Sequence, residues 1–173
     1  MFIDYLNKAG KASGVDFILF LLFLDKAFNA VDIQYERIKS FDKTAANTTK
    51  MLNDIHLYVI AANWLNEIFL AFKQLKDSKS GDFYDDLWDI IKRYRQYFRD
   101  TPNKLRNELE HGSLDAALID YWNNPNKVKT DLLYQFSFNP ETEVIRLGGK
   151  EYQLGHKNLK QLEIELHNFF KGL

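Results

Sequence analysis

The chain contains no cysteine, and only 3 prolines and 8 glycines occur among its 173 residues. Without cysteine there is no disulfide, no thiolate metal ligand and no cysteine nucleophile. The scarcity of glycine and proline argues against an architecture with many turns, such as a large β-sandwich. The sequence therefore favours helices joined by few loops.

Net charge and long apolar runs are also missing. The chain has 23 Lys and Arg against 24 Asp and Glu, which excludes a strongly basic coat for nucleic acid and restricts any polyanion site to a local patch. The longest apolar run, residues 17–24, lies between Asp16 and Asp25, whereas a membrane span needs about 20 residues. We expect no membrane partner and, without a recognisable leader, a cytoplasmic location.

Hydrophobic residues make up 46% of the chain, enough for one core in a single domain over residues 1–173. Apolar residues recur at alternating spacings of three and four, which is typical of helices with one buried face. The first helix is expected over about 14–39, with the stripe Phe17, Leu21, Leu24, Phe28, Val31, Tyr35 and Ile38. The second is expected to begin after Thr44 and end near Lys76, with the stripe Met51, Ile55, Tyr58, Ala62, Leu65, Phe69 and Phe72.

A third helix is expected from Asp82, with the stripe Phe83, Leu87, Ile90, Tyr94 and Tyr97. Thr101-Pro102 predicts a new helix from 102 to about 111, because proline is favoured at a first helical position, and Gly112 ends it before another helix over 114–123. A period of two over 132–138 and 143–147 predicts a hairpin, with a third short strand over 151–154. Leu159, Leu162, Leu166 and Phe169 form the last helical stripe.

These elements predict an all-α fold: an antiparallel helical bundle with a small β-hairpin inserted before the C-terminal helix. The apolar stripes are interpreted as core and say nothing about function.

One short segment carries chemistry: Arg106-Asn107-Glu-Leu-Glu-His111, at the predicted helix end. From the composition of the chain, Arg-Asn-x-x-x-His is expected roughly 0.01 times by chance. The motif and the surrounding helices resemble the HEPN superfamily (higher eukaryotes and prokaryotes nucleotide-binding), whose motif is an arginine, often followed by a polar residue, and a histidine four to six residues later. The resemblance covers essentially the whole chain.

The resemblance implies a HEPN-like bundle and a metal-independent endoribonuclease that acts as a homodimer in a toxin–antitoxin, phage-defence or RNA-processing system. It implies RNA as the substrate, no cofactor and no metal, and an antitoxin or other protein as a further partner. The residues that it marks as catalytic are Arg106, Asn107 and His111. Some members of the superfamily bind without cutting, so a non-catalytic RNA-binding or protein-docking module is the alternative.

The chemistry of these residues is compatible with RNA cleavage. RNA supplies its own nucleophile, the 2′-hydroxyl, so the protein needs a group that moves protons near neutral pH and a cation that holds the phosphate. His111 at a helix C-terminus and the planar guanidinium of Arg106 suit these roles. Without function, Arg106 would pair with Glu110, Asn107 would be a solvated polar residue and His111 would stabilise the helix end.

Residues 92–106 contain six basic residues and one acidic residue. Arg95, Arg99 and Lys104 are therefore candidate RNA-backbone contacts. The alternative is that this helix simply has acidic residues at its start and basic residues at its end, which complements its dipole. Tyr94 and Tyr97 are interpreted as core residues rather than as platforms for base stacking.

Overall fold

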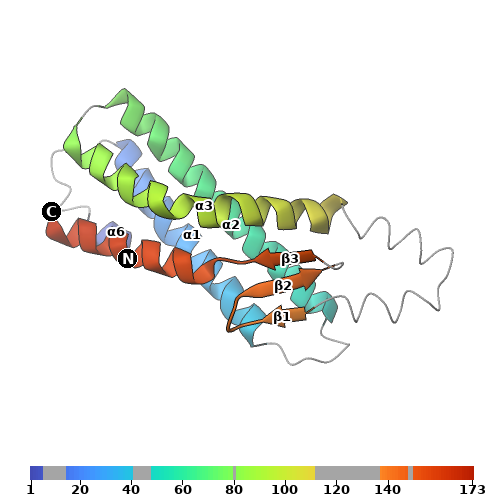
Figure 1. Ribbon diagram of the computed structural model, residues 1–173. Coiled ribbons are helices and arrows are strands. Elements are labelled where there is room, and N and C mark those ends of the chain that lie inside the picture. The colour runs from blue at the N-terminus through green and yellow to red at the C-terminus, as the bar shows by residue number, and fades with distance from the viewer. Residues whose placement is uncertain (6–14, 41–47, 80, 112–136, 148–149) are drawn as a thin grey trace, which may run out of the picture.

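The computed structural model describes residues 1–5, 15–40, 48–79, 81–111, 137–147 and 150–173. A short 3-10 helix, η1 (Phe2–Tyr5), precedes three long helices, α1 (Val15–Lys39), α2 (Thr48–Ser78) and α3 (Asp82–His111). Three short strands follow, β1 (Ser137–Asn139), β2 (Val144–Leu147) and β3 (Lys150–Gln153), and α6 (His156–Gly172) ends the chain. A mostly helical chain with a small sheet before the last helix was predicted from the sequence and is confirmed (Figure 1).

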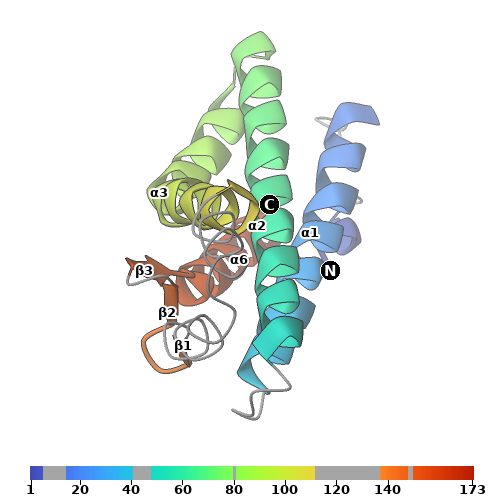
Figure 2. The ribbon, with the colours of Figure 1, turned by 90° about the vertical axis from the view of Figure 1, so that its right-hand side faces the viewer.

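Helix α2 lies between α1 and α3 (Figure 2). Arg37 near the end of α1 approaches Asp54 near the start of α2, and the rings of Phe20 and Phe72 lie 4.6 Å apart at the other end, so α1 and α2 are antiparallel. All seven residues of the predicted α1 stripe are buried, as are six of the seven predicted for α2, while Met51 is half-buried. The helical period was therefore a correct guide to these two helices.

The buried side of α3 differs from the prediction. Tyr84, Leu87 and Ile91 are buried, whereas Phe83, Ile90 and Tyr94 are only half-buried. Tyr97 is 44% exposed, so its interpretation as a core residue was wrong. The physical reason is that α3 contacts both α2 and α6, and the direction of its buried side is set by two neighbours rather than by its own widest apolar stripe.

The predicted helix boundary at Thr101-Pro102 was also wrong, because α3 continues through Pro102 to His111. Proline inside a helix removes one backbone hydrogen bond and costs roughly 3 kcal/mol. Pro102 is buried and Leu105, one turn later, is fully buried. Burial of this side of α3 offsets the cost and keeps the helix continuous. The helix predicted over 114–123 and the first residues of the predicted strand 132–138 lie outside the described residues.

The strands form an antiparallel sheet in the order β1-β2-β3. Phe138, Ile145 and Tyr152 are paired across the three strands and are all buried, so one side of the sheet faces the core. The ring of Phe138 meets Tyr35 of α1 edge-on, and the hydroxyl of Tyr58 in α2 donates to the carbonyl of Leu154. The sheet therefore packs against the α1–α2 pair.

In α6, the predicted Leu159, Leu162 and Leu166 are buried, but Phe170 is buried in place of Phe169. The helix begins directly after Gly155, whose φ of 72° lies in the left-handed region. A Cβ at this position would lie 3.0 Å from the carbonyl oxygen of Tyr97 in α3. Both the turn and the close approach of α3 therefore require glycine here.

We expect Gly155→Ala to lower the free energy of unfolding by about 1–2 kcal/mol, because the new methyl group meets both a left-handed backbone and the Tyr97 carbonyl. The measurement is urea denaturation followed by circular dichroism. Gly172→Ala is the matched control, since nothing lies within 4 Å of the position that its new methyl group would take. Equal stability of the two variants would contradict this account of Gly155.

Candidate functional site

The Arg-Asn-x-x-x-His segment forms the last turns of α3. Leu105 is fully buried and fixes this part of the helix against the core, Arg106 is half-buried and Asn107 is exposed. His111 is the last residue of α3, and its side chain lies outside the described part of the structure. The segment is thus attached to the core by two leucines, the buried Leu105 and the half-buried Leu109, and presents a polar residue to solvent.

The relative directions of the three positions follow from the continuous helix. On an ideal helix, positions 107 and 111 are about 40° apart and positions 106 and 111 are about 140° apart. Pro102 does not break α3 before the motif, and α3 is described as far as His111. The convergence of Arg106 and His111 in one cleft therefore stays a prediction, whereas Asn107 and His111 share one side of α3.

Polar contacts with neighbouring helices fix α3. Arg93 Nη2 lies 2.9 Å from Glu165 Oε2 of α6, and the hydroxyl of Tyr94 donates to the same carboxylate. Arg95 Nε donates to Asn66 Oδ1 of α2 at 2.9 Å. These contacts connect α3 to both neighbours three to four turns before the motif.

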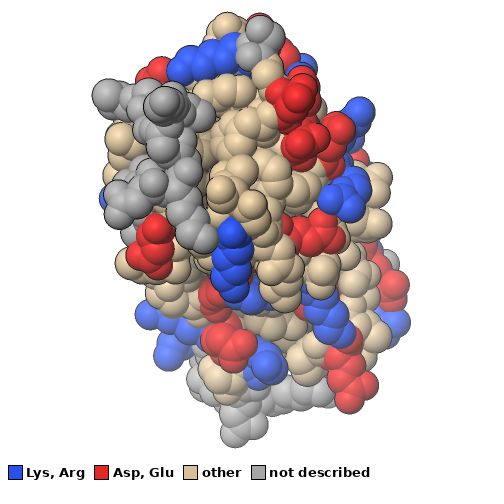
Figure 3. Space-filling view, turned by 90° about the vertical axis from the view of Figure 1, so that its left-hand side faces the viewer, with Lys and Arg blue, Asp and Glu red and all other residues tan. Residues whose placement is uncertain are grey.

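The three residues predicted to contact RNA have different surroundings. Arg95 is half-buried, and burial lowers the pKa of its guanidinium. Arg99 is paired with the neighbouring Asp100, whose carboxylate accepts a 2.6 Å hydrogen bond from Arg99 Nε, and Lys104 is exposed. Because Arg93 and Arg99 are paired with carboxylates, this stretch carries less free positive charge than the sequence count suggests. The face in Figure 3 lies opposite the end of α3 that carries the motif, and on it basic and acidic side chains are mixed.

A second polar cluster, which the sequence did not indicate, is buried where the sheet meets α1 and α6. Glu143 is 1% exposed and has a φ of 57°, an unusual value for a residue with a side chain. Its carboxylate accepts hydrogen bonds from the hydroxyl of Tyr35 and the backbone N–H of Lys157 in the first turn of α6. The negative charge therefore stabilises the N-terminus of α6.

His156 belongs to the same cluster. Its ring stacks on that of Tyr35, with centroids 3.7 Å apart, and its Nε2 lies 3.6 Å from Asp32 Oδ1. Lys160 Nζ donates to Asp32 Oδ2 at 2.7 Å. Burial lowers the pKa of His156 to about 4, and the same burial, together with Glu143, raises the pKa of Tyr35 above its usual range. No sequence motif marks this cluster, because its members come from α1, the β1–β2 turn and α6.

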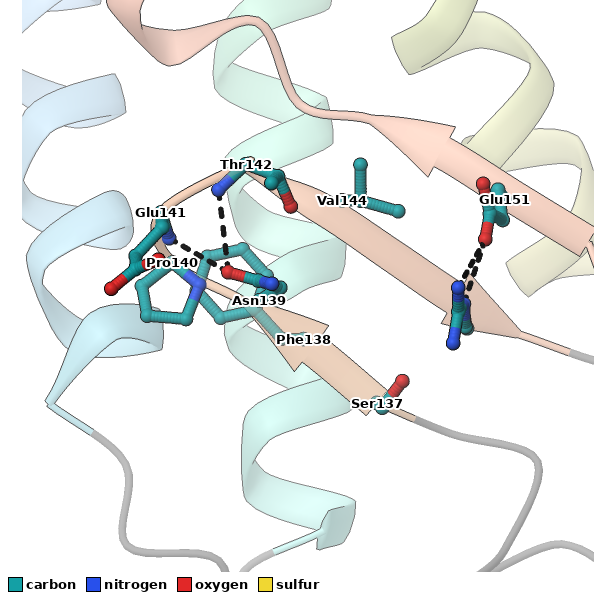
Figure 4. Close-up of a pocket in the computed structure, with 9 residues that line it drawn as sticks. Ser137, Phe138, Asn139, Pro140, Glu141, Thr142, Val144 and Glu151 are labelled. Atoms are coloured by element: carbon teal, nitrogen blue, oxygen red, sulfur yellow. Dashed lines mark hydrogen bonds and ion pairs between the residues drawn. The ribbon is translucent and has the colours of Figure 1, made fainter.

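A pocket of about 620 Å³ lies over the outer side of the sheet (Figure 4). Asn139 Oδ1 accepts hydrogen bonds from the backbone N–H groups of Glu141 and Thr142 and so closes the β1–β2 turn at its edge. Arg146 and Glu151 pair across the strands at 2.7 Å. The paired charges neutralise each other, and none of the described lining residues belongs to the α3 motif.

Among the described residues, no group of three or more His, Asp or Glu side chains is arranged to hold a metal ion. One described segment, Lys50–Ser78, is long and apolar enough to cross a membrane by composition, but 56% of its most apolar window is buried inside the fold. This burial is typical of the core helix of a soluble protein.

No family model, curated protein or solved structure matches the chain.

We expect the buried imidazole of His156 to contribute to the pH dependence of stability. The unfolded chain binds a proton at this residue near pH 6.5, whereas the folded chain does so only near pH 4. The unfolded state therefore binds more protons between these values, so stability falls as the pH falls through this range. We expect a loss of about 2 kcal/mol between pH 7.5 and 5 from this residue.

The measurement is urea denaturation at several pH values for the wild type and for His156→Phe, which keeps an aromatic ring on Tyr35 but does not titrate. The variant should lose less stability than the wild type as the pH is lowered. Other titrating groups, including the partly buried His167, are common to both proteins and cancel in the difference. Parallel curves for the two proteins would refute the role of His156.

Proposed function

We propose that this protein is a metal-independent endoribonuclease of the HEPN type that acts as a cytoplasmic homodimer. The observation that carries the proposal is the Arg106-Asn107-x-x-x-His111 motif on a continuous helix, α3, that is anchored in the core. The helical architecture with a terminal helix after the motif is compatible with the superfamily. A toxin–antitoxin, phage-defence or RNA-processing system is the setting that the resemblance suggests.

In the proposed reaction, the 2′-hydroxyl of a ribose attacks the adjacent phosphorus, and the bond to the 5′-oxygen of the next nucleotide breaks. The products are a 2′,3′-cyclic phosphate and a 5′-hydroxyl. His111 moves the proton between the attacking and leaving oxygens, and Arg106 stabilises the charge that develops on the phosphate. Asn107, on the same side of α3 as position 111, orients the imidazole or the phosphate.

The charge distribution supports RNA contact by a small surface rather than by a basic coat. Lys104 is exposed close to the motif, whereas Arg95 is half-buried and donates to Asn66, and Arg99 is largely neutralised by Asp100. Few phosphate contacts give weak binding with a shallow dependence on salt concentration. Such binding is sufficient for a nuclease that releases its products.

We expect purified protein to cleave labelled RNA in excess EDTA, and His111→Ala to reduce the rate about 10²- to 10⁴-fold while RNA binding changes little, because a positioned proton-transfer group contributes about that factor. Arg106→Ala should weaken both binding and cleavage, since the phosphate contact exists before and during the reaction. DNA, which lacks the 2′-hydroxyl, should bind at low salt and remain intact. Rates are measured on denaturing gels, and the cyclic phosphate is identified by mass spectrometry.

Arg146→Ala is the matched control for Arg106→Ala, because Arg146 is an exposed arginine on the sheet that is paired with Glu151. It should cleave at the wild-type rate. Cleavage that requires added Mg²⁺, or a His111→Ala variant of full activity, would eliminate the proposed mechanism. RNA binding without any cleavage would leave the non-catalytic binding module as the function.

A further inference from the structure

The outer side of the α1–α2 pair exposes a set of large hydrophobic residues. Among the described residues, eleven large hydrophobic side chains are exposed, and seven of them lie on these two helices. We call these seven the outer face: Leu19, Leu22, Phe23 and Ile33 on α1, and Leu57, Ile60 and Trp64 on α2. Their exposed fractions lie between 37% and 46%.

The outer face has helical periodicity of its own. On α1, the positions 19, 23, 26, 30 and 33 follow one another at spacings of four, three, four and three. Leu19, Phe23 and Ile33 belong to the outer face, and the exposed Lys26 and the half-buried Ala30 lie between them. On α2, Leu57, Ile60 and Trp64 continue the same alternation. This spacing is that of a helix–helix seam, and it occurs in addition to the stripe that each helix buries in the core.

The two seams form a single surface, because the rings of Phe23 and Trp64 meet edge-on with centroids 6.3 Å apart. From ordinary side-chain areas and the exposed fractions, the seven residues expose roughly 550 Å² on one copy, at the upper end of the largest apolar patches of monomers. Two copies would bury on the order of 1,100 Å² from these residues alone, close to the lower limit of about 1,200 Å² for a stable interface. Flanking polar residues would add the remaining area.

The charges on the outer face favour a second copy of this chain over a strongly basic or a strongly acidic partner. Lys26 lies within the α1 seam, and Glu67 lies one turn beyond Trp64 on α2; both are exposed. A two-fold arrangement in which α1 of one copy faces α2 of the other brings opposite charges together twice. A strongly basic or strongly acidic partner would meet one of these residues with the same sign.

We propose that a second copy of this chain covers the outer face, with α1 of one copy facing α2 of the other about a two-fold axis. The outer face is then the surface through which the homodimer of the proposed function forms. Only the effect of this dimer on the motif rests on the proposed function. Asn66 contacts Arg95 and Phe72 contacts Tyr84, so α2 and α3 are antiparallel and the end of α3 lies at the same end of α2 as Leu57. A copy seated on the outer face near Leu57 would therefore lie toward the end of α2 at which α3 carries the motif.

The test is the mass of the full chain in solution by light scattering coupled to size exclusion, over about 1–100 µM. The wild type should have twice its chain mass of 20.4 kDa. Trp64→Glu and Ile60→Glu should each raise the dimer dissociation constant at least about 100-fold, because the dimer would bury two unpaired carboxylates. Circular dichroism checks that each variant keeps the helical fold.

Ile164→Glu is the matched control, since Ile164 is a similarly exposed isoleucine on α6 and not on the outer face. It should remain dimeric. Lys26→Glu changes only an exposed side chain, so folding is not at risk, and it should weaken the dimer about 10-fold by placing like charges opposite each other. Adding Glu67→Lys should restore the dimer.

A wild-type monomer at 100 µM, assemblies larger than two copies, or equal dissociation by Ile164→Glu would overturn the proposal. If Glu67→Lys fails to restore the dimer of the Lys26→Glu variant, α1 of one copy does not face α2 of the other. A dimer of the expected behaviour that leaves RNA intact would support this interface and refute the nuclease function. Full cleavage by a monomeric Trp64→Glu variant would show that RNA cleavage does not require this interface.

Discussion

The burial of α2 on two sides is the constraint on which the rest of the structure depends. α1 packs along one side of α2 and α3 along the other, and residues such as Ile55, Tyr58, Leu65 and Phe69 are fully buried. A helix packed between two neighbours exposes only the side that faces neither of them. In α2 this side carries Leu57, Ile60 and Trp64, so the same packing that forms the core also creates the exposed apolar surface.

The position of the motif is a consequence of this packing. α3 follows α2 in the opposite direction and remains helical through Pro102, because Leu105 is buried on the next turn. The helix thereby carries Arg106 and Asn107 to its far end, beyond the contacts that fix α3 to α2 and α6. A site at the end of a rigid helix has a fixed position, whereas a site on a long loop would have to be ordered by its ligand.

The C-terminal part of the chain is held by buried polar groups as well as by apolar contacts. Glu143 connects the β1–β2 turn to Tyr35 of α1 and to the first turn of α6, and His156 stacks on the same tyrosine. Each buried charge or polar group is costly unless it finds partners. The sheet and α6 therefore have little freedom to shift relative to α1 once these contacts form.

Local spacing and turn-forming residues were sufficient to predict the stripes of α1 and α2 and the hairpin around Asn139, whereas the helix end predicted at Gly112 lies outside the described residues. The motif, too, is visible in the sequence, because its three residues lie within six positions. Contacts between distant segments could not be predicted in this way: Tyr97 lies at the surface, Pro102 lies inside α3, and Glu143 is buried against α1. Periodicity is a property of one helix, whereas burial, pKa and pairing depend on the neighbours that a residue meets after folding.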